Sequence, residues 1–152
     1  MPEITFQRGH TSILIADFYA DIMDTLPHAT GRGVVQKASA LQSVARDAGV
    51  MLCYCATVFR PGYPEIGERN KTFRQRKASG QSAIANPIDV IHPGVRPRDG
   101  EVVVGKHRVN ALYGTDRGCE GWVHLYSLES FGYPREGLHI FPRVYIRLPC
   151  SF

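Results

Sequence analysis

The chain has 152 residues, 43% of them hydrophobic, which is enough for one buried core of ordinary size and predicts a single folded domain. The formal net charge of +4 comes from Lys and Arg residues spread along the whole length among acidic residues, so we expect no nucleic-acid-binding face. No apolar run approaches the length of a membrane span and no signal-like segment opens the sequence, so we expect a cytoplasmic protein with no membrane partner.

The first predicted element is a strand over residues 12–16, a short apolar run bounded by polar residues. Such a run is typical of a parallel strand that is buried on both faces. Asp17 follows the run directly, so we expect its carboxylate at the carboxyl end of this strand.

A helix and a second strand come next. Between Gly33 and Ala48, apolar residues recur at steps of four, three, four and three, which predicts an amphipathic helix that ends at Gly49. The apolar run over residues 50–58 predicts the second strand, and the Pro- and Gly-containing stretch over residues 61–64 ends it. A strand, a helix and a strand in this order predict a right-handed βαβ crossover.

The pattern is weaker over residues 65–100. We expect a short helix over residues 69–79, followed by a connection rich in turn residues. The basic run over residues 69–77 is interpreted as a solvated helix face, with the rim of a site for an anionic substrate as the alternative.

A third strand is predicted over residues 101–105, and Lys106 ends it. Thr115 is then expected to be the N-cap of a further helix. Asp17 and Lys106 thus come at the ends of two strands of one α/β sheet, where such sheets bind their ligands. The pattern indicates an acid and an amine of an active site, and the alternative is a structural ion pair at a strand end.

Three stretches of the chain, taken together, form a recognisable pattern of residues in a specific order and at specific spacings. They are residues 13–18 (ILIADF), residues 59–66 (FRPGYPEI) and residues 102–116 (VVVGKHRVNALYGTD). Together they closely resemble the isochorismatase-like cysteine hydrolases. The resemblance implies a three-layer α/β/α, Rossmann-like domain with a mostly parallel sheet. It also implies hydrolysis of an amide C–N bond or a vinyl ether in a small-molecule substrate, without a cofactor.

In the family that the chain resembles, an Asp, a Lys and a Cys perform the chemistry. The resemblance assigns the first two roles to Asp17, as the general base that takes the thiol proton, and to Lys106, which supports the negative charges. Arg60 and Tyr63, in the loop after the second strand, are candidates for binding a substrate carboxylate, and Tyr113 is a further candidate. The alternatives for the first two are an exposed loop arginine and a packing tyrosine.

No metal site is predicted. His92 lies in the loop before the third strand, and some members of the resembled family bind a metal through an Asp and nearby histidines. That pattern is not visible over residues 59–71.

The resemblance does not extend to the end of the chain. We expect an incomplete isochorismatase-like domain over residues 1–116 and an atypical tail over residues 117–152. The family nucleophile would be expected around residues 138–141, which contain no Cys. Cys119 comes too soon after the third strand, and Cys150 lies in a Pro-broken segment with no following helix, so neither is predicted to be a nucleophile. A shifted reading frame or a retained intron is one explanation for such a tail.

The other two cysteines belong to the second predicted strand. Cys53 and Cys55 alternate along it, so both face one side of the sheet, where we expect them to be small core residues. No two cysteines have the two-residue gap of a zinc or redox motif.

Two functions remain open from the sequence. The first is a hydrolase of the resembled family that acts on a small molecule through Asp17 and Lys106, with its nucleophile missing. The alternative is a catalytically inactive, truncated family member that acts by binding or by forming a homo-oligomer. The interpretation as a nucleotide-binding module is supported only by Gly31-Arg32-Gly33 before a helix. It is set aside because this motif lacks the third glycine.

Overall fold

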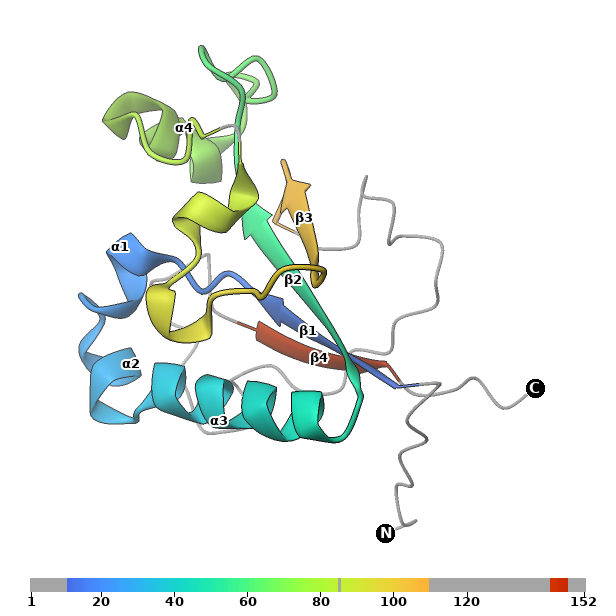
Figure 1. Cartoon of the computed structure of the whole chain (residues 1–152). Helices are drawn as coiled ribbons and strands as arrows, with labels where there is room; N and C mark the ends of the chain where they lie inside the picture. Colours follow the sequence, from blue (N-terminus) through green and yellow to red (C-terminus); the bar gives the residue numbers. More distant parts are fainter. Residues whose placement is uncertain (1–10, 85, 110–142, 148–152) are drawn as a thin grey trace, which may run out of the picture.

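The computed structural model describes residues 11–84, 86–109 and 143–147 (Figure 1). In chain order, the elements are β1 (Ser12–Ala16), α1 (Ala20–Met23), α2 (Pro27–Gly31), α3 (Val34–Asp47), β2 (Met51–Thr57), α4 (Lys71–Ser79), the 3-10 helices η2 (Pro87–Val90) and η3 (Pro93–Val95), β3 (Val102–Lys106) and β4 (Arg143–Arg147). Among the described helices, none is long and apolar enough to cross a membrane.

The four described strands form one sheet in the order β3-β2-β1-β4. β1 pairs with β2, and β2 with β3, in parallel, so that Ala16 lies opposite Cys55 and Thr57 lies opposite Lys106. β4 runs antiparallel to β1 and forms the edge of this sheet opposite to β3 (Figure 1). The sheet is therefore mostly parallel, which confirms the α/β fold class expected from the sequence.

The main predicted elements are confirmed, with ends that differ by at most two residues. The predicted strands over residues 12–16, 50–58 and 101–105 are β1, β2 and β3, and the predicted helices over residues 33–48 and 69–79 are α3 and α4. Lys106 is the last residue of β3 rather than the residue after it.

The structure also contains elements that the sequence pattern did not predict. The helices α1 and α2 are four and five residues long, too short for a helical period to be recognised. Both 3-10 helices begin at a proline, and the side chains of Asn86 and His92 cap them by accepting hydrogen bonds from the backbone N–H groups of Ile88 and Gly94. β4 was also unexpected, and the helix predicted to begin at Thr115 lies outside the described residues.

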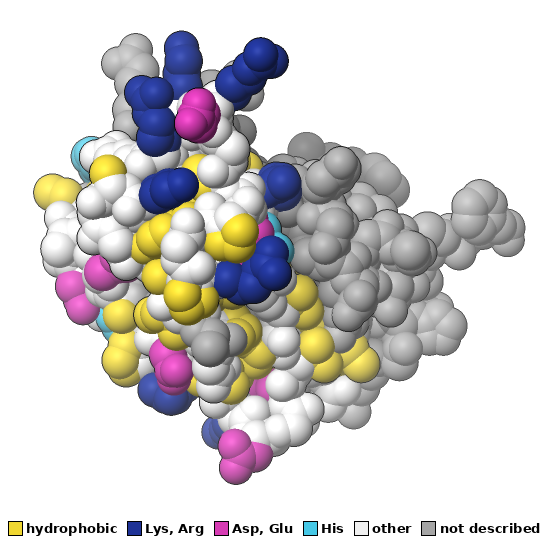
Figure 2. Space-filling view, turned by 90° about the horizontal axis from the view of Figure 1, so that it is seen from above, with side chains coloured by type: hydrophobic (Ala, Val, Ile, Leu, Met, Phe, Trp, Pro, Cys, Tyr) yellow, Lys and Arg dark blue, Asp and Glu magenta, His cyan; other side chains and the backbone are white. Residues whose placement is uncertain are grey.

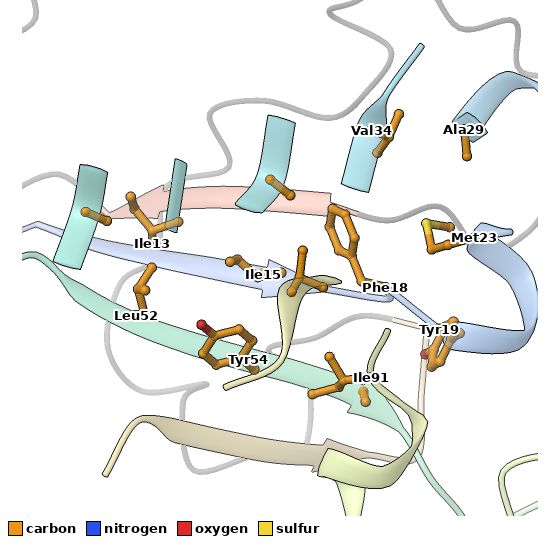
Figure 3. Packing of buried hydrophobic residues seen from close by; sticks show 14 residues of the cluster. Ile13, Ile15, Phe18, Tyr19, Met23, Ala29, Val34, Leu52, Tyr54 and Ile91 are labelled. Carbon is orange, nitrogen blue, oxygen red and sulfur yellow. The ribbon is translucent and has the colours of Figure 1, made fainter. Parts of the chain in front are cut away.

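The larger hydrophobic core lies between the sheet and α3 (Figure 3). Apolar side chains of one sheet face meet the buried stripe of the helix, which recurs at helical spacing. The main contributors are Ile13, Ile15, Leu52 and Tyr54 from the sheet, and Val34, Ala38 and Ala45 from α3. Because each large aliphatic side chain contributes about 1.5–3 kcal/mol when fully buried, this layer is a major source of stability.

The opposite face of the sheet carries Leu14, Ala16, Cys53 and Cys55, which form a second buried cluster. The prediction that both cysteines share one face and serve as small core residues is therefore confirmed. The second helical layer of the expected α/β/α arrangement stays a prediction, since the buried cluster on this face is formed by strand residues of the described part of the chain.

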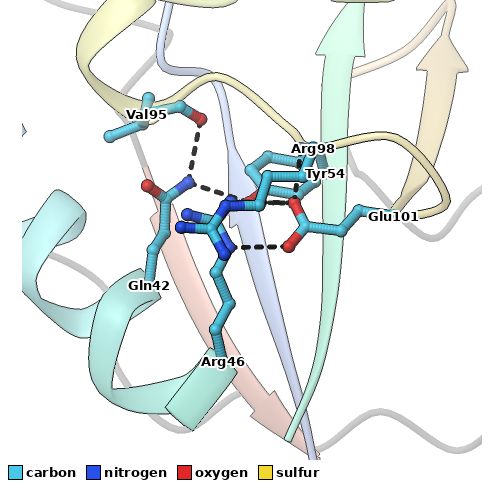
Figure 4. A network of polar contacts seen from close by, with 6 residues as sticks. All are labelled: Gln42, Arg46, Tyr54, Val95, Arg98 and Glu101. Carbon is cyan, nitrogen blue, oxygen red and sulfur yellow. Dashed lines mark hydrogen bonds and ion pairs between the residues drawn. The ribbon is translucent and has the colours of Figure 1, made fainter. Parts of the chain in front are cut away.

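A polar network ties α3 to the chain segment that leads into β3 (Figure 4). Arg46 binds Glu101 in a two-pronged ion pair, with Nε at 2.7 Å from Oε1 and Nη2 at 2.9 Å from Oε2. The Tyr54 hydroxyl donates to Glu101 Oε2 at 2.9 Å and accepts from Gln42, which also donates to the Val95 carbonyl at 2.8 Å. Since bidentate pairs restrain geometry, the network fixes where β3 begins.

One of the basic residues of α4 is buried rather than solvated. Residues 69–77 were predicted to be solvated, which is right for four basic residues and wrong for Arg76, which is buried with 6% of its surface exposed. The exposed four are Arg69, Lys71, Arg74 and Lys77. The reason is that Arg76 lies on the same side of α4 as the buried Phe73. Both basic side chains (Lys and Arg) and acidic ones (Asp and Glu) are seen on the visible described surface (Figure 2).

Candidate active site

Asp17 and Lys106 meet at the carboxyl ends of the parallel strands. Asp17 follows β1, Lys106 ends β3, and β2 lies between these two strands. The lysine side chain therefore reaches across the end of β2 to the carboxylate. This juxtaposition is the one expected from the sequence, because parallel strands end at the same edge of a sheet.

The contact between the two side chains is close and shielded from water. Lys106 Nζ lies 2.8 Å from Asp17 Oδ1 and 2.9 Å from Oδ2. The exposed fractions are 2% for the Lys106 side chain and 6% for that of Asp17. Nζ also donates to the Val109 carbonyl at 2.9 Å. Two buried opposite charges stabilise each other through their attraction and their hydrogen bonds. Removing one partner of such a pair strongly destabilises the folded state.

The backbone at Asp17 adopts a conformation that few side chains favour. Its φ is 65°, in the left-handed region. Its N–H donates to the Cys55 carbonyl at 3.0 Å and its carbonyl accepts from Tyr19 N–H at 3.1 Å. Asp tolerates this region better than most residues, and such conformations cluster at functional sites. The turn directs the chain away from β1 immediately after the last strand residue.

Comparison with known proteins agrees with this arrangement. Residues 11–117, well over half of the chain, match the isochorismatase domain. The chain belongs to the isochorismatase family. It is also similar to the crystal structure of an isochorismatase family protein from Desulfovibrio vulgaris subsp. vulgaris str. Hildenborough, with 25% sequence identity and a TM-score of 0.51. That match covers 67% of this chain and 55% of the other, so the chain spans about half the length of this relative. No curated protein matches the sequence.

The family match covers the residues of the candidate site. The matched residues include both Asp17 and Lys106, the pair that the structure brings together. The catalytic roles of the two residues stay predictions at this point.

Tyr19 is a member of the site that the sequence did not reveal. Its hydroxyl donates to Asp17 Oδ1 at 2.6 Å and accepts from the Thr57 backbone N–H at 2.9 Å. Burial, and next the negative charge of Asp17, raise the pKa of Tyr19 well above its usual range. A tyrosine two residues after an acid is an ordinary sequence feature, and only the turn at Asp17 brings its hydroxyl back to the carboxylate.

Cys55 lies close to the pair but is not an activated thiol. It is 2% exposed, in the cluster on the opposite sheet face. Burial raises the pKa of Cys55 to about 12, and the charge of Lys106 offsets only part of this effect. Since the thiolate is the nucleophilic form, Cys55 is poorly suited to attack a substrate. Cys119 and Cys150 lie outside the described residues.

The predicted substrate-binding residues have other partners in the loop after β2. The Arg60 side chain is 73% exposed and pairs with Glu65. Tyr63 is buried against Phe59, and its hydroxyl donates to the Gln81 carbonyl at 3.1 Å. Tyr113 lies outside the described residues. Substrate binding by these three residues stays a prediction.

The histidines near the site make hydrogen bonds of their own. His92 lies 3.1 Å from the Asp24 carboxylate and accepts from Gly94 N–H, while His107 lies 2.7 Å from the Val58 carbonyl. Within the described residues, no three His, Cys, Asp or Glu side chains are grouped so that they could hold a metal ion.

Proposed function

We propose that the Asp17–Lys106 pair is the acid–base centre of a hydrolase that cleaves an amide C–N bond or a vinyl ether in a small molecule. The observation that carries this proposal is the ion pair itself, which is almost fully removed from solvent at the strand ends. An active site is the usual place for buried, strongly interacting charges at this edge of an α/β sheet.

Each member of the pair has a defined chemical part. Asp17 takes the proton of the attacking group, because its carboxylate is the proton acceptor of the site. Lys106 stabilises the negative charge that develops as the proton moves, and it does so from a place where little water screens its charge. The described cysteines lie in the core, so we assign the attack to no described residue.

The decisive experiment compares hydrolysis by the wild-type chain with that of Asp17→Asn. The substrate panel contains small amides, N-carbamoyl compounds and vinyl ethers. We expect turnover in the wild type and a loss of about 100-fold or more in the variant, since a positioned base typically contributes that much. Asp47→Asn, at the exposed end of α3, is the matched control and should keep full activity. Equal activity of a folded Asp17→Asn chain would refute the proposal.

A second candidate is a catalytically inactive family member that binds a small molecule or forms a homo-oligomer. It is favoured by the core position of Cys53 and Cys55. Light scattering and ligand-induced shifts of the melting temperature distinguish the two. Binding or self-association without turnover supports this candidate, and turnover by a monomer excludes it. The cytoplasmic location expected from the sequence stays a prediction.

A further inference from the structure

We propose that Tyr19 is a positioning residue that locks the Asp17 carboxylate so that Oδ2, the oxygen turned away from the tyrosine, exchanges the proton. The inference rests on the proposed acid–base function of Asp17. It concerns a residue outside the expected Asp–Lys–Cys set, and four observations carry it.

The first contact fixes the direction of the hydrogen bond. A phenol hydroxyl has one proton to donate. The Thr57 backbone N–H, 2.9 Å from the Tyr19 oxygen, can only be a donor, so the tyrosine oxygen is its acceptor. The phenol proton is therefore directed to Asp17 Oδ1, at 2.6 Å. This distance is in the range of charge-assisted O–H···O⁻ bonds, which are stronger than neutral ones.

The second point is that Tyr19 keeps its proton. Its side chain is in the core, with 1% of the residue exposed, and burial beside a carboxylate raises the pKa of Tyr19 well above its usual range. At neutral pH, Tyr19 is thus a permanent donor and takes no part in proton transfer itself.

The third contact holds the aromatic ring. The guanidinium of Arg76 lies 4.8 Å from the centroid of the Tyr19 ring, and Arg76 Nη1 donates to Ser82 Oγ at 2.7 Å. A cation over a ring face is attracted to it, more strongly where water is excluded. Arg76 is one of the buried polar residues, so its side chain restrains the ring of Tyr19.

The fourth contact holds the backbone of Tyr19. Tyr19 forms an isolated antiparallel bridge with Ile91, and His92 N–H donates to the Phe18 carbonyl at 2.8 Å. The side chain is therefore anchored at its backbone, its ring and its hydroxyl.

The consequence for Asp17 follows from counting lone pairs. A carboxylate oxygen accepts about two hydrogen bonds. Oδ1 lies 2.6 Å from the Tyr19 hydroxyl and 2.8 Å from Lys106 Nζ, whereas Oδ2 lies 2.9 Å from Lys106 Nζ and is not the oxygen to which Tyr19 donates. Tyr19 thus makes the two oxygens unequal, and Oδ2 is the oxygen that Tyr19 leaves to take part in proton exchange.

The test compares Tyr19→Phe with Tyr54→Phe. Both tyrosines are at most 1% exposed and both have hydrogen-bonded hydroxyls, but Tyr54 bonds to Gln42, Arg46 and Glu101 instead of the site. The readout is the side-chain carboxyl ¹³C resonance of Asp17 in the full chain, assigned by its loss in Asp17→Asn. We expect Tyr19→Phe to shift this resonance and Tyr54→Phe to leave it in place. A shift in Tyr19→Phe no larger than that in Tyr54→Phe would overturn the inference.

Kinetics then separate a positioning role from a structural one. On a substrate that the wild type hydrolyses, Tyr19→Phe should lower kcat roughly 10- to 100-fold, with KM changed by less than about twofold, because only the alignment of the base is lost. Tyr54→Phe should keep the kcat of the wild type. An unchanged kcat in Tyr19→Phe would refute the role. If the wild type hydrolyses nothing, the proposed function fails, and the carboxyl resonance alone decides whether Tyr19 positions Asp17.

A measurement on the unmodified chain covers the case in which Tyr19→Phe does not fold, since it leaves the buried Thr57 N–H without an acceptor. Tyrosine labelled with ¹³C at Cζ is recorded in mixed H₂O and D₂O. A locked hydroxyl exchanges slowly and gives two resonances for Tyr19, whereas a freely exchanging one gives a single averaged resonance and would overturn the inference.

Discussion

Asp17 and Lys106 carry opposite charges and are both buried in the folded protein. The stability of each buried charge therefore depends on the other. The exposed fractions of 6% and 2% mean that each charge depends on the other for its solvation. We expect Lys106→Met to lower the free energy of unfolding by about 3–5 kcal/mol, because a buried carboxylate is left unpaired. Asp17→Asn should also be costly, although Asn tolerates the left-handed backbone there.

The double variant should be more stable than the sum of the single losses implies. Asp17→Asn with Lys106→Met removes both charges, so no buried charge lacks its partner. Urea denaturation of the four proteins gives the coupling energy, which we expect to be about 2 kcal/mol or more, within the range for residues in one network. Strictly additive losses would show that the two charges do not interact in solution.

Glu101 gives a second prediction, on acid stability. Burial raises the pKa of Glu101, but the hydrogen bonds from Arg46, the Arg98 N–H and Tyr54 lower it further, to about 2, from an ordinary value of 4.5. A lowered pKa in the folded state stabilises the protein above the unfolded value, and the effect is lost as pH falls through the folded value. The loss should amount to about 3 kcal/mol between roughly pH 5 and 2.

The control for this linkage is Glu101→Gln, which has no charge to titrate. The stability difference between wild type and variant, measured by denaturation at several pH values, should shrink as pH falls from 5 to 2. A difference that stays constant over that range would contradict the role of Glu101.

Among the secondary elements, the end of β3 is the most tightly packed place near the site. A Cβ at Gly105 would lie 2.8 Å from Val58 Cγ2, a branched side chain that is itself buried. We expect Gly105→Ala to cost about 1–3 kcal/mol, as overpacking in a core does. Because Lys106 follows, the strand end would shift and activity would fall as well.

Gly67→Ala is the matched control for this substitution. Nothing lies within 4 Å of a Cβ at Gly67, so stability should change by less than about 0.5 kcal/mol. Thermal melts of both variants test this comparison. Equal melting temperatures would show that the end of β3 accommodates the added methyl group without loss of stability.

The strands β1, β2 and β3 were predictable because each is a short apolar run, and the helix α3 because its apolar residues recur at helical spacing. The shortest helices and β4 were missed. The four- and five-residue helices α1 and α2 are set by local turns, and β4 is defined by its partner β1 rather than by its own pattern.

The site was predictable to the same extent as the strands. Asp17 and Lys106 follow from strand ends, which the sequence locates. Tyr19 and Arg76 do not, because their contacts depend on the left-handed turn at Asp17 and on which side of α4 is packed inward. A basic run gives no sign that one of its members is buried.

The sheet as a unit combines the parallel β3-β2-β1 set with one antiparallel strand, β4, on β1. β1 is therefore covered on both sides by hydrogen-bonded neighbours. Removing residues 143–152 should speed amide hydrogen exchange at the β1 positions that bond to β4, since local opening tracks unprotected backbone bonds. β3 amides, at the other edge, serve as the control and should exchange as before. Unchanged exchange in β1 would show that β4 does not pair there in solution.

The central proposal is that Asp17 and Lys106 serve chemistry rather than structure alone, and its support is the match to the isochorismatase family together with the strand-end ion pair. The most direct measurement is the hydrolysis rate of the Asp17→Asn, Lys106→Met double variant, on any substrate that the wild type cleaves. We predict a folded protein with a cooperative melt and a rate at least about 100-fold below the wild type. A folded double variant that hydrolyses at the wild-type rate would show that the pair is only a structural ion pair.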